Sequence, residues 1–202
     1  MQMSNSHIIL TQSGIVAIAS VGETAELERN ATAAELKSVE GITSASRRAE
    51  RLAWRALLRS LEPEATVEYL PSGKPQILNS KYQHISVSHC SDLVVVALSE
   101  KPCGVDVERI DRNFERVKSR YISEPEFELS AEPYWAAVVW CAKEALYKVA
   151  GREGVDFKQD IIIKSVQCQG LSLSLIAELF GHEQVELRGE IVDDNHIVVY
   201  TI

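Results

Sequence analysis

The sequence predicts an α+β protein made of two similar α+β subdomains, related by a pseudo-twofold axis, each with a small, mainly antiparallel sheet and one principal helix. Short alternating patterns typical of strands occur in both halves, each half has one long segment of helical periodicity, and the 202 residues suffice for two such units. No fixed-period repeat relates the halves. We expect an N-terminal subdomain over residues 1–101 and a C-terminal subdomain over residues 102–202.

The first half begins with strand patterns and continues with helical ones. Residues 7–20 read as two short strands around a Ser-Gly turn, although a single bent strand would give the same pattern. Residues 23–39 are loosely helical. A firmer helix follows over TSASRRAERLAWRALLRSL, because Ser44 or Ser46 can cap it and apolar residues recur at helical spacing. Most of its five arginines are expected on a solvated face.

The remaining elements alternate between strands and one further helix. TVEYL, followed by the turn PSGKP, precedes a hairpin pattern formed by HISVSHC and DLVVVALS. The second half restarts with CGVDVERI, and after a mixed polar segment a helix runs from Pro133 to Ala150, with Gly151 as its C-terminal cap. The tail predicts several antiparallel strands, in DIIIKSVQC, LSLSLIAEL, VELRGEIV and HIVVYTI.

Composition narrows the function classes. The net charge is −8 and the isoelectric point is about 5.2, which argues against a general nucleic-acid-binding protein, because phosphate neutralisation needs a basic surface. No run approaches the ~18 apolar residues of a membrane span. The start, MQMSNSHIIL, lacks the basic region and long apolar core of a signal peptide. We expect a cytoplasmic protein that binds neither nucleic acid nor membrane.

The strand CGVDVERI carries two carboxylates among apolar residues. Side chains alternate along a strand, so Asp106 and Glu108 share one face while Val105 and Val107 share the other. A half-exposed strand with an acidic wet face would explain this pattern. A divalent cation would explain it too, because adjacent carboxylates repel unless a hard ion such as Mg²⁺ compensates them.

The helix segment WCAKEALYK offers a third carboxylate. Glu144 and Lys148 are four residues apart and therefore share one face, with Trp140 one turn earlier. An ordinary solvent-exposed Glu-to-Lys pair has the same spacing. If Glu144 instead lies near the acidic strand, three carboxylates would suit an octahedral Mg²⁺ that also binds phosphate oxygens, and Lys148 would meet a phosphate.

Two shorter motifs lie in the first half. Ser88 and His89 stand at an expected strand end, where a lone histidine is more often a structural hydrogen-bonding residue. The turn SGKP places a flexible glycine beside Lys74 and Pro75, so that backbone and ammonium can both approach an anion. It lacks the spacing of a P-loop, and lone turns of this kind are common.

Together these motifs resemble the 4′-phosphopantetheinyl transferase superfamily, in its longer, pseudo-dimeric class that activates carrier domains of peptide and polyketide synthases. The resemblance rests on GKP, SVSHC, GVDVE and WCAKEALYK in that order, with Glu144 36 positions after Glu108. It extends from Arg47 to Lys148, and only the strand pattern supports it in the tail.

The resemblance implies a substrate and a metal. Coenzyme A would bind between the two halves as co-substrate, and its pyrophosphate would meet Mg²⁺ held by Asp106, Glu108 and Glu144. Glu144 and Lys148 would be the catalytic residues, with Lys148 facing the pyrophosphate. The nucleotide end would contact residues of the first half, with Ser88 and His89 near the 3′-phosphate, Lys74 and Pro75 beside the nucleotide, and Arg47 in the same phosphate cluster.

The implied reaction is attack by a serine hydroxyl of an apo acyl or peptidyl carrier protein on the β-phosphorus of coenzyme A, which transfers phosphopantetheine and releases adenosine 3′,5′-bisphosphate. Two alternatives remain open at this point. The same carboxylates would serve a Mg²⁺-dependent nucleotide or coenzyme A pyrophosphatase, which leaves the Ser-His and GKP motifs without a role. A non-catalytic carrier-binding relative would retain the fold, but the intact acidic residues argue against it.

The carrier protein needs a docking surface. Carrier proteins are typically acidic, as is this chain, so docking cannot depend on overall charge. RIDRNFERVKSR is locally basic and includes Arg112, Arg116 and Lys118, with Phe114 and Val117 as expected apolar contacts. A solvated amphipathic helix would have the same composition. By analogy with the family, the protein would act as a monomer.

Overall fold

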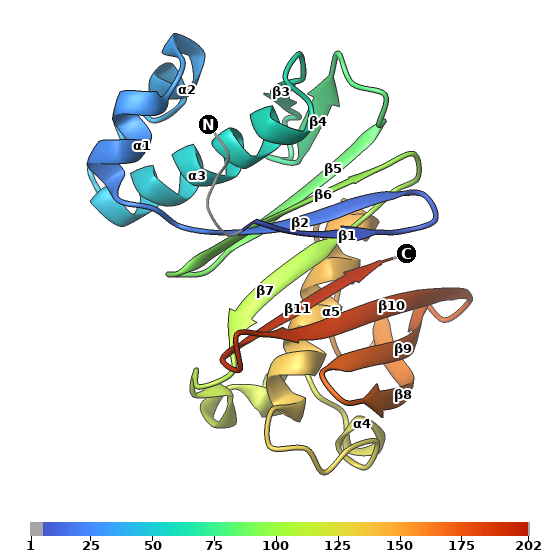
Figure 1. Ribbon diagram of the computed structural model, residues 1–202. Coiled ribbons are helices and arrows are strands. Elements are labelled where there is room, and N and C mark those ends of the chain that lie inside the picture. Colours follow the sequence, from blue (N-terminus) through green and yellow to red (C-terminus); the bar gives the residue numbers. More distant parts are fainter. Residues whose placement is uncertain (1–5, 202) are drawn as a thin grey trace. The chain divides into compact units, whose positions relative to one another are not determined.

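The computed structural model describes residues 6–201 (Figure 1). The chain divides into two compact units, Met1–Pro102 and Cys103–Ile202, which are described separately below. Each unit combines an antiparallel sheet with a principal helix, which confirms the predicted α+β class. Residues 1–5, which entered the expectation about a signal peptide, and Ile202, the end of the last expected strand, lie outside the described residues.

The sheet of the first unit has four strands in the order β1-β2-β6-β5, and every neighbouring pair is antiparallel. The predicted pair of short strands at residues 7–20 is correct. An additional two-stranded sheet, β3-β4, takes in part of the segment that the sequence assigned to a turn. The strand bounds are β1 (His7–Leu10), β2 (Gly14–Ser20), β3 (Thr66–Tyr69), β4 (Pro75–Leu78), β5 (His84–His89) and β6 (Leu93–Ser99).

Helix α3 (Ala45–Leu61) packs its apolar face on this sheet, against β2 and β6 (Figure 1). Ser44 caps it by accepting a hydrogen bond from the Arg47 backbone N–H at 3.4 Å. The helix and the sheet together form a core that includes Ala53, Leu57, Leu58, Val94, Val96 and Leu98. The principal helix of this half was therefore predicted correctly in position.

The segment 23–39 forms two short helices where the sequence suggested one loose helix. The helices are α1 (Thr24–Asn30) and α2 (Ala33–Ser38). They separate because Ala31 is extended and Thr32 starts a new capping box with Glu35. Both pack beside α3.

Three arginines of α3 bind neighbouring elements, which corrects the expectation of a mainly solvated basic face. Arg48 forms an ion pair with Glu28 of α1, and Arg59 forms one with Glu35 of α2 at 3.0 Å. Arg51 donates to the Ser38 carbonyl at 3.2 Å. These side chains attach the two short helices to the principal one.

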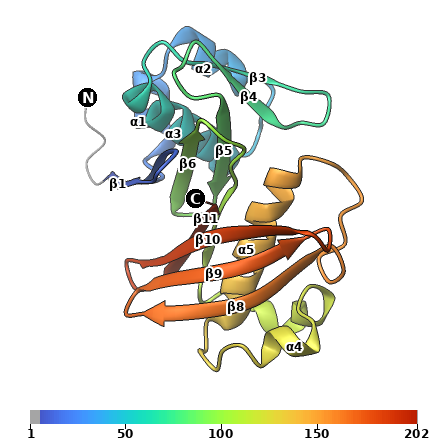
Figure 2. The same cartoon turned by 90° about the vertical axis from the view of Figure 1, so that its right-hand side faces the viewer.

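The second unit has a five-stranded antiparallel sheet in the order β7-β11-β10-β9-β8 (Figure 2). Helix α5 (Trp135–Ala150) packs across it and contacts β7, β11 and β8. It begins two residues after the expected Pro133 and ends at Gly151, whose φ of 61° is the left-handed cap that the sequence predicted. The strand bounds are β7 (Val105–Arg109), β8 (Ile161–Gln169), β9 (Ser172–Leu179), β10 (Glu183–Val192) and β11 (His196–Thr201).

Short helical turns fill the region between β7 and α5. They are two 3-10 helices, η1 (Phe114–Arg116) and η2 (Lys118–Arg120), and one α-helical turn, α4 (Glu124–Phe127). The basic segment is therefore not an amphipathic α-helix. Its side chains come from two tight turns instead.

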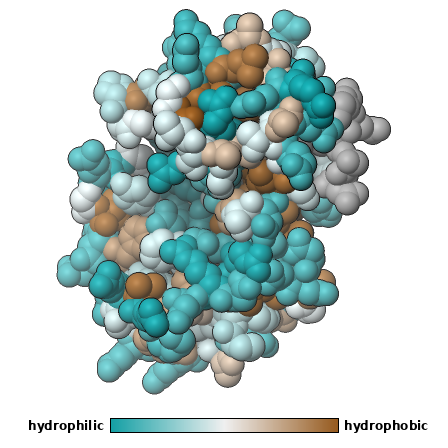
Figure 3. All heavy atoms as spheres, turned by 90° about the vertical axis from the view of Figure 1, so that its left-hand side faces the viewer, coloured by the Kyte–Doolittle hydropathy of each residue, from teal (hydrophilic) through white to brown (hydrophobic). Residues whose placement is uncertain are grey.

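The face drawn in Figure 3 is mainly hydrophilic, and hydrophobic residues appear on it in small groups. This distribution agrees with a chain that is 25% charged. Over residues 6–201, the helices are all too short or too polar to cross a membrane.

Candidate active site

The acidic strand β7 is more buried than an exposed acidic face would be. Val105 and Val107 are buried on one side, as the alternation predicts. On the other side Asp106 is only 6% exposed, and Glu108 is half-buried. A wet acidic face therefore does not explain the two carboxylates.

Gly104 allows β7 to approach α5 closely. A Cβ atom at this position would lie 1.9 Å from the backbone carbonyl oxygen of Ala145, a distance that no side chain can occupy. Its backbone N–H donates to the Thr201 hydroxyl at 3.0 Å. The glycine of CGVDVERI thus sets the spacing between the acidic strand and the helix that carries Glu144. The residues around Gly104 in the sequence do not predict this role.

Lys148 of α5 pairs with the acidic strand. Its Nζ lies 2.9 Å from Oδ1 of Asp106 and donates to the Val105 carbonyl oxygen at 2.7 Å. The ion pair is partly buried, with the Asp106 side chain 9% exposed. The helix and the strand are thereby joined at one charged contact, which the spacing of Glu144 and Lys148 alone did not reveal.

Glu108 is paired with a different basic residue from the one that pairs with Asp106. It forms an ion pair with Arg112, whose guanidinium lies over the rings of Phe114 and Trp140, 5.1 and 5.5 Å from their centroids. The tryptophan of WCAKEALYK therefore contacts the basic partner of Glu108.

The carboxylates influence one another electrostatically. Burial raises the pKa of Glu144, and the charge of Asp106 raises it further against the opposing effect of Lys148. Burial also raises the pKa of Glu108, Arg112 lowers it, and Asp106 raises it. Without a bound cation, the ionised forms of Glu108 and Glu144 are therefore disfavoured.

The donor chemistry of this group fits a hard divalent cation. Asp106, Glu108 and Glu144 supply carboxylate oxygens, the ligands that Mg²⁺ prefers. Within residues 6–201, however, the acidic, histidine and cysteine side chains are not gathered into a cluster of three or more around one point. In the structure Lys148 and Arg112 compensate two of the three carboxylates.

The first unit contains a hollow of about 720 Å³. Arg47, Pro75 and His89, three of the five residues expected at the nucleotide end, line it. Ser88 is buried and Lys74 is not among the lining residues. The other lining residues are Gly41, Ile42, Thr43, Ser44, Glu50, Arg51, Trp54, Tyr69 and Val87.

Several residues of this hollow had no role in the sequence analysis. Arg51 lies over the ring of Tyr69, 5.8 Å from its centroid. Glu50 contacts His89, with 3.2 Å between Oε2 and Nδ1. Glu50 and Arg51 belong to α3, where helical spacing predicted only a solvated polar side, so no local signal identified them.

Pro75 lies in strand β4 and not in the turn to which the sequence assigned it. The tight turn comes before it, where the Leu70 N–H donates to the Lys74 carbonyl at 2.9 Å and Gly73 has a φ of 81°. The proline is tolerated in β4 because this strand pairs with β3 alone, so its missing N–H breaks no central ladder.

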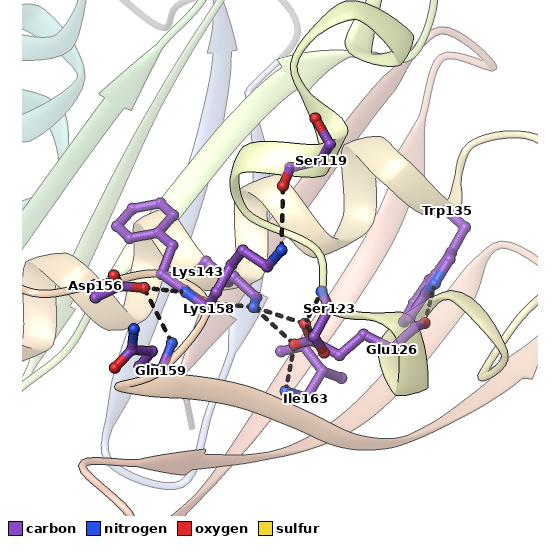
Figure 4. Close-up of polar contacts among 10 residues, drawn as sticks. Ser119, Ser123, Glu126, Trp135, Lys143, Asp156, Lys158, Gln159 and Ile163 are labelled. Carbon is purple, nitrogen blue, oxygen red and sulfur yellow. Dashed lines mark hydrogen bonds and ion pairs between the residues drawn. The ribbon is translucent and has the colours of Figure 1, made fainter.

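A buried ion pair connects α5 to α4 (Figure 4). Glu126 of α4 and Lys143 of α5 are both 0% exposed, with 2.7 Å between Nζ and Oε1. Lys143 also donates to the Phe157 carbonyl at 2.6 Å. The Glu126 carboxylate accepts from the backbone N–H groups of Ser123 and Ile163, each at 2.8 Å. The ion pair thus joins α4, α5, β8 and the loop that contains Phe157.

The basic segment after β7 differs from the expected docking stripe in its apolar part. Phe114 is buried in the core of the second unit and cannot serve as a contact for a partner. Arg112 is engaged with Glu108, as described above. Lys118 pairs with Glu115 at 2.6 Å, and Arg116 is exposed. Fewer exposed basic side chains are therefore available to a partner protein than the composition of RIDRNFERVKSR suggested.

One comparison with known proteins concerns the second unit. The family model described as the 4′-phosphopantetheinyl transferase superfamily matches residues 102–198. The chain is also 30% identical over 87 residues to "4'-phosphopantetheinyl transferase psf-1" of Bacillus pumilus. That similarity covers 40% of this chain and 37% of the relative's length. It therefore spans well under half of either protein.

Proposed function

Because the model of the 4′-phosphopantetheinyl transferase superfamily matches its second unit, we propose that this protein transfers the 4′-phosphopantetheine arm of coenzyme A to a serine of an apo acyl or peptidyl carrier protein. The observation that supports this best is the joining of β7 to α5 through the contact between Asp106 and Lys148. It puts an acidic strand and a basic helical residue side by side. We further propose that the protein belongs to the longer, pseudo-dimeric class and acts as a cytoplasmic monomer. The residues proposed for the nucleotide end and those proposed for the metal both belong to this one chain.

Asp106, Glu108 and Glu144 are the residues that we propose to hold Mg²⁺. When bound, Mg²⁺ would neutralise negative charge on the pyrophosphate of coenzyme A. The raised pKa values of Glu108 and Glu144 agree with such a need for positive charge. Lys148 and Arg112, the present counter-ions, are then available to phosphate oxygens.

The side chains of the second unit account for the chemistry. Lys148 stabilises the charge that develops on the pyrophosphate oxygens. Glu144 accepts the proton of the carrier serine, and we favour a path through a water molecule because a carboxylate that also binds a cation is a weak base. The serine oxygen forms a bond to the β-phosphorus, and the bond from this phosphorus to the bridging oxygen breaks. Adenosine 3′,5′-bisphosphate leaves with that oxygen.

The hollow of the first unit is the proposed site for the nucleotide end. Arg47 and His89 both line it and supply positive charge or hydrogen-bond donors for a 3′-phosphate. Pro75 lines it as well, and Lys74 precedes it in the β3-β4 hairpin. Ser88 is buried at the end of β5, where it supports the strand that carries His89.

Mass spectrometry of an apo carrier protein, incubated with the protein, coenzyme A and Mg²⁺, tests the proposed function. A gain in carrier mass equal to the phosphopantetheine arm supports transfer. Hydrolysed coenzyme A with unmodified carrier would instead identify a pyrophosphatase. Unchanged carrier and coenzyme A, with the two proteins eluting together, would identify a non-catalytic binding protein.

Substitutions at the nucleotide end should affect binding more than turnover. We expect His89→Ala and Lys74→Ala to raise the KM for coenzyme A about tenfold and to change kcat little, because each removes a charged hydrogen bond remote from the reacting phosphorus. Steady-state kinetics with coenzyme A and with dephospho-coenzyme A measures this. An equal penalty on both substrates would remove His89 from the 3′-phosphate.

Charge reversal in the basic segment should affect the carrier protein alone. We expect Arg116→Glu combined with Lys118→Glu to raise the KM for the carrier about tenfold, without changing the KM for coenzyme A, because charges at the rim of an interface act mainly on the rate of encounter. The reaction of the unmodified protein should slow with salt at subsaturating carrier, and the double variant should lose much of that dependence.

Initial rates against carrier concentration at low and high salt provide the measurement. The pair Lys158→Glu and Lys164→Glu is the matched control, because it reverses two exposed charges elsewhere in the second unit. Identical salt slopes and carrier KM values for the unmodified protein and the Arg116/Lys118 variant would show that this segment is only a solvated surface.

A further inference from the structure

An acidic side chain lies in the hollow where the proposed function requires an anion to bind. Glu50 lines the hollow together with Arg47, Arg51 and His89. An uncompensated carboxylate among these side chains would repel a phosphate and weaken its binding. The position of Glu50 therefore suggests that its charge is used within the protein.

Both carboxylate oxygens of Glu50 have partners. Oε2 lies 3.2 Å from Nδ1 of His89, and Oε1 accepts a hydrogen bond from the Ser46 hydroxyl at 3.0 Å. The Glu50 side chain is 12% exposed and the His89 side chain 48% exposed. The carboxylate thus lies back in the wall of the hollow, while the imidazole reaches further toward solvent.

This contact determines which ring nitrogen can meet a ligand. Nδ1 must carry a proton to donate to the carboxylate, so Nε2 is the nitrogen that remains for a ligand. A phosphate oxygen accepts a hydrogen bond from Nε2 only when that nitrogen is also protonated. A carboxylate beside Nδ1 holds the ring in one orientation.

We propose that Glu50 is a positioning residue for the 3′-phosphate of coenzyme A, which acts by orienting His89 so that Nε2 is left for the phosphate. The inference rests on the proposed function and extends it. The preference for coenzyme A over dephospho-coenzyme A would then depend on Glu50, whose charge has the same sign as that of the 3′-phosphate.

Isothermal titration of the full chain with coenzyme A and with dephospho-coenzyme A tests this inference. Glu50→Gln retains the shape of the side chain and an acceptor for Ser46, but it removes the charge that faces His89. We expect this variant to bind coenzyme A about tenfold more weakly than the unmodified protein and to bind dephospho-coenzyme A equally well. If Glu50 only repelled the ligand, its removal would tighten coenzyme A binding, so the sign of the change distinguishes the two roles.

Two further variants isolate the path through His89. Glu64→Gln makes the same charge change at an exposed position of the first unit and should leave both affinities unchanged. In a His89→Ala background, Glu50→Gln should cause no additional loss, because its effect requires the imidazole.

The outcomes separate this inference from the proposed function. Unchanged or tighter binding of coenzyme A by Glu50→Gln, an equal loss for both ligands, or a loss that persists without His89 would each overturn the role of Glu50 alone. If the unmodified protein bound both ligands equally, the 3′-phosphate assignment of His89 would fall, and this inference with it. Binding of neither ligand would contradict the proposed function itself.

Discussion

Asp106→Ala should reduce transfer of phosphopantetheine by about 100- to 1,000-fold while the protein remains folded. Asp106 is a proposed metal ligand and also the partner of Lys148, at 2.9 Å, so its loss removes both a negative donor and the orientation of a basic residue. The fold should tolerate the change, because removing one carboxylate relieves repulsion that raises the pKa of Glu108 and Glu144.

Initial rates under saturating Mg²⁺ and thermal unfolding measure these two effects. Asp111→Asn is the matched control, because Asp111 is an exposed carboxylate shortly after the same strand and pairs with Arg109. It should retain nearly full activity. Glu108→Gln should be milder than Asp106→Ala, since a neutral oxygen can still hold an ion or a water. Normal turnover by Asp106→Ala would exclude this residue from the metal site.

Lys143→Met should lower the free energy of unfolding by about 3–5 kcal/mol, the cost of leaving a buried charge without its partner. Lys143 and Glu126 are both fully buried, and the methionine would leave the Glu126 carboxylate in the core with only neutral donors. With about 2–4 °C per kcal/mol, the midpoint of thermal unfolding should fall by roughly 10 °C.

Denaturant and thermal unfolding of the full chain measure this loss. Lys158→Met is the control, since Lys158 is exposed and its side-chain Nζ donates to the Ser119 carbonyl at 3.3 Å (Figure 4). It should change stability by no more than about 0.5 kcal/mol. Adding Glu126→Gln to Lys143→Met should recover part of the loss, because the neutral amide removes the uncompensated charge. A loss below about 1 kcal/mol for Lys143→Met would mean that water reaches the pair.

Local patterns in the sequence were sufficient for most of the fold. The helical period identified α3 and α5, and Gly151 marked the end of α5, because caps and periodicity involve residues within a few positions of one another. The alternation of Val105, Asp106, Val107 and Glu108 likewise assigned each side chain to a face of β7. The α+β class follows from these local features.

Local patterns gave wrong predictions where the structure of a segment depends on contacts with other elements. The segment 23–39 appeared as one loose helix, because the break at Ala31 depends on the capping box of Thr32 and on packing against α3. Phe114 appeared to be a surface contact because its neighbours are charged. Its burial depends on contacts with Trp140 and the rest of the second core.

The order of the elements, the positions of the acidic and basic motifs, and the resemblance that those motifs carry can all be read from the amino-acid sequence. Which charges meet depends on tertiary packing. Lys148 pairs with Asp106 across 42 positions, Lys143 with Glu126 across 17, and His89 with Glu50 across 39. Periodicity specifies the face of an element, whereas the partner of a charge depends on which distant element covers that face.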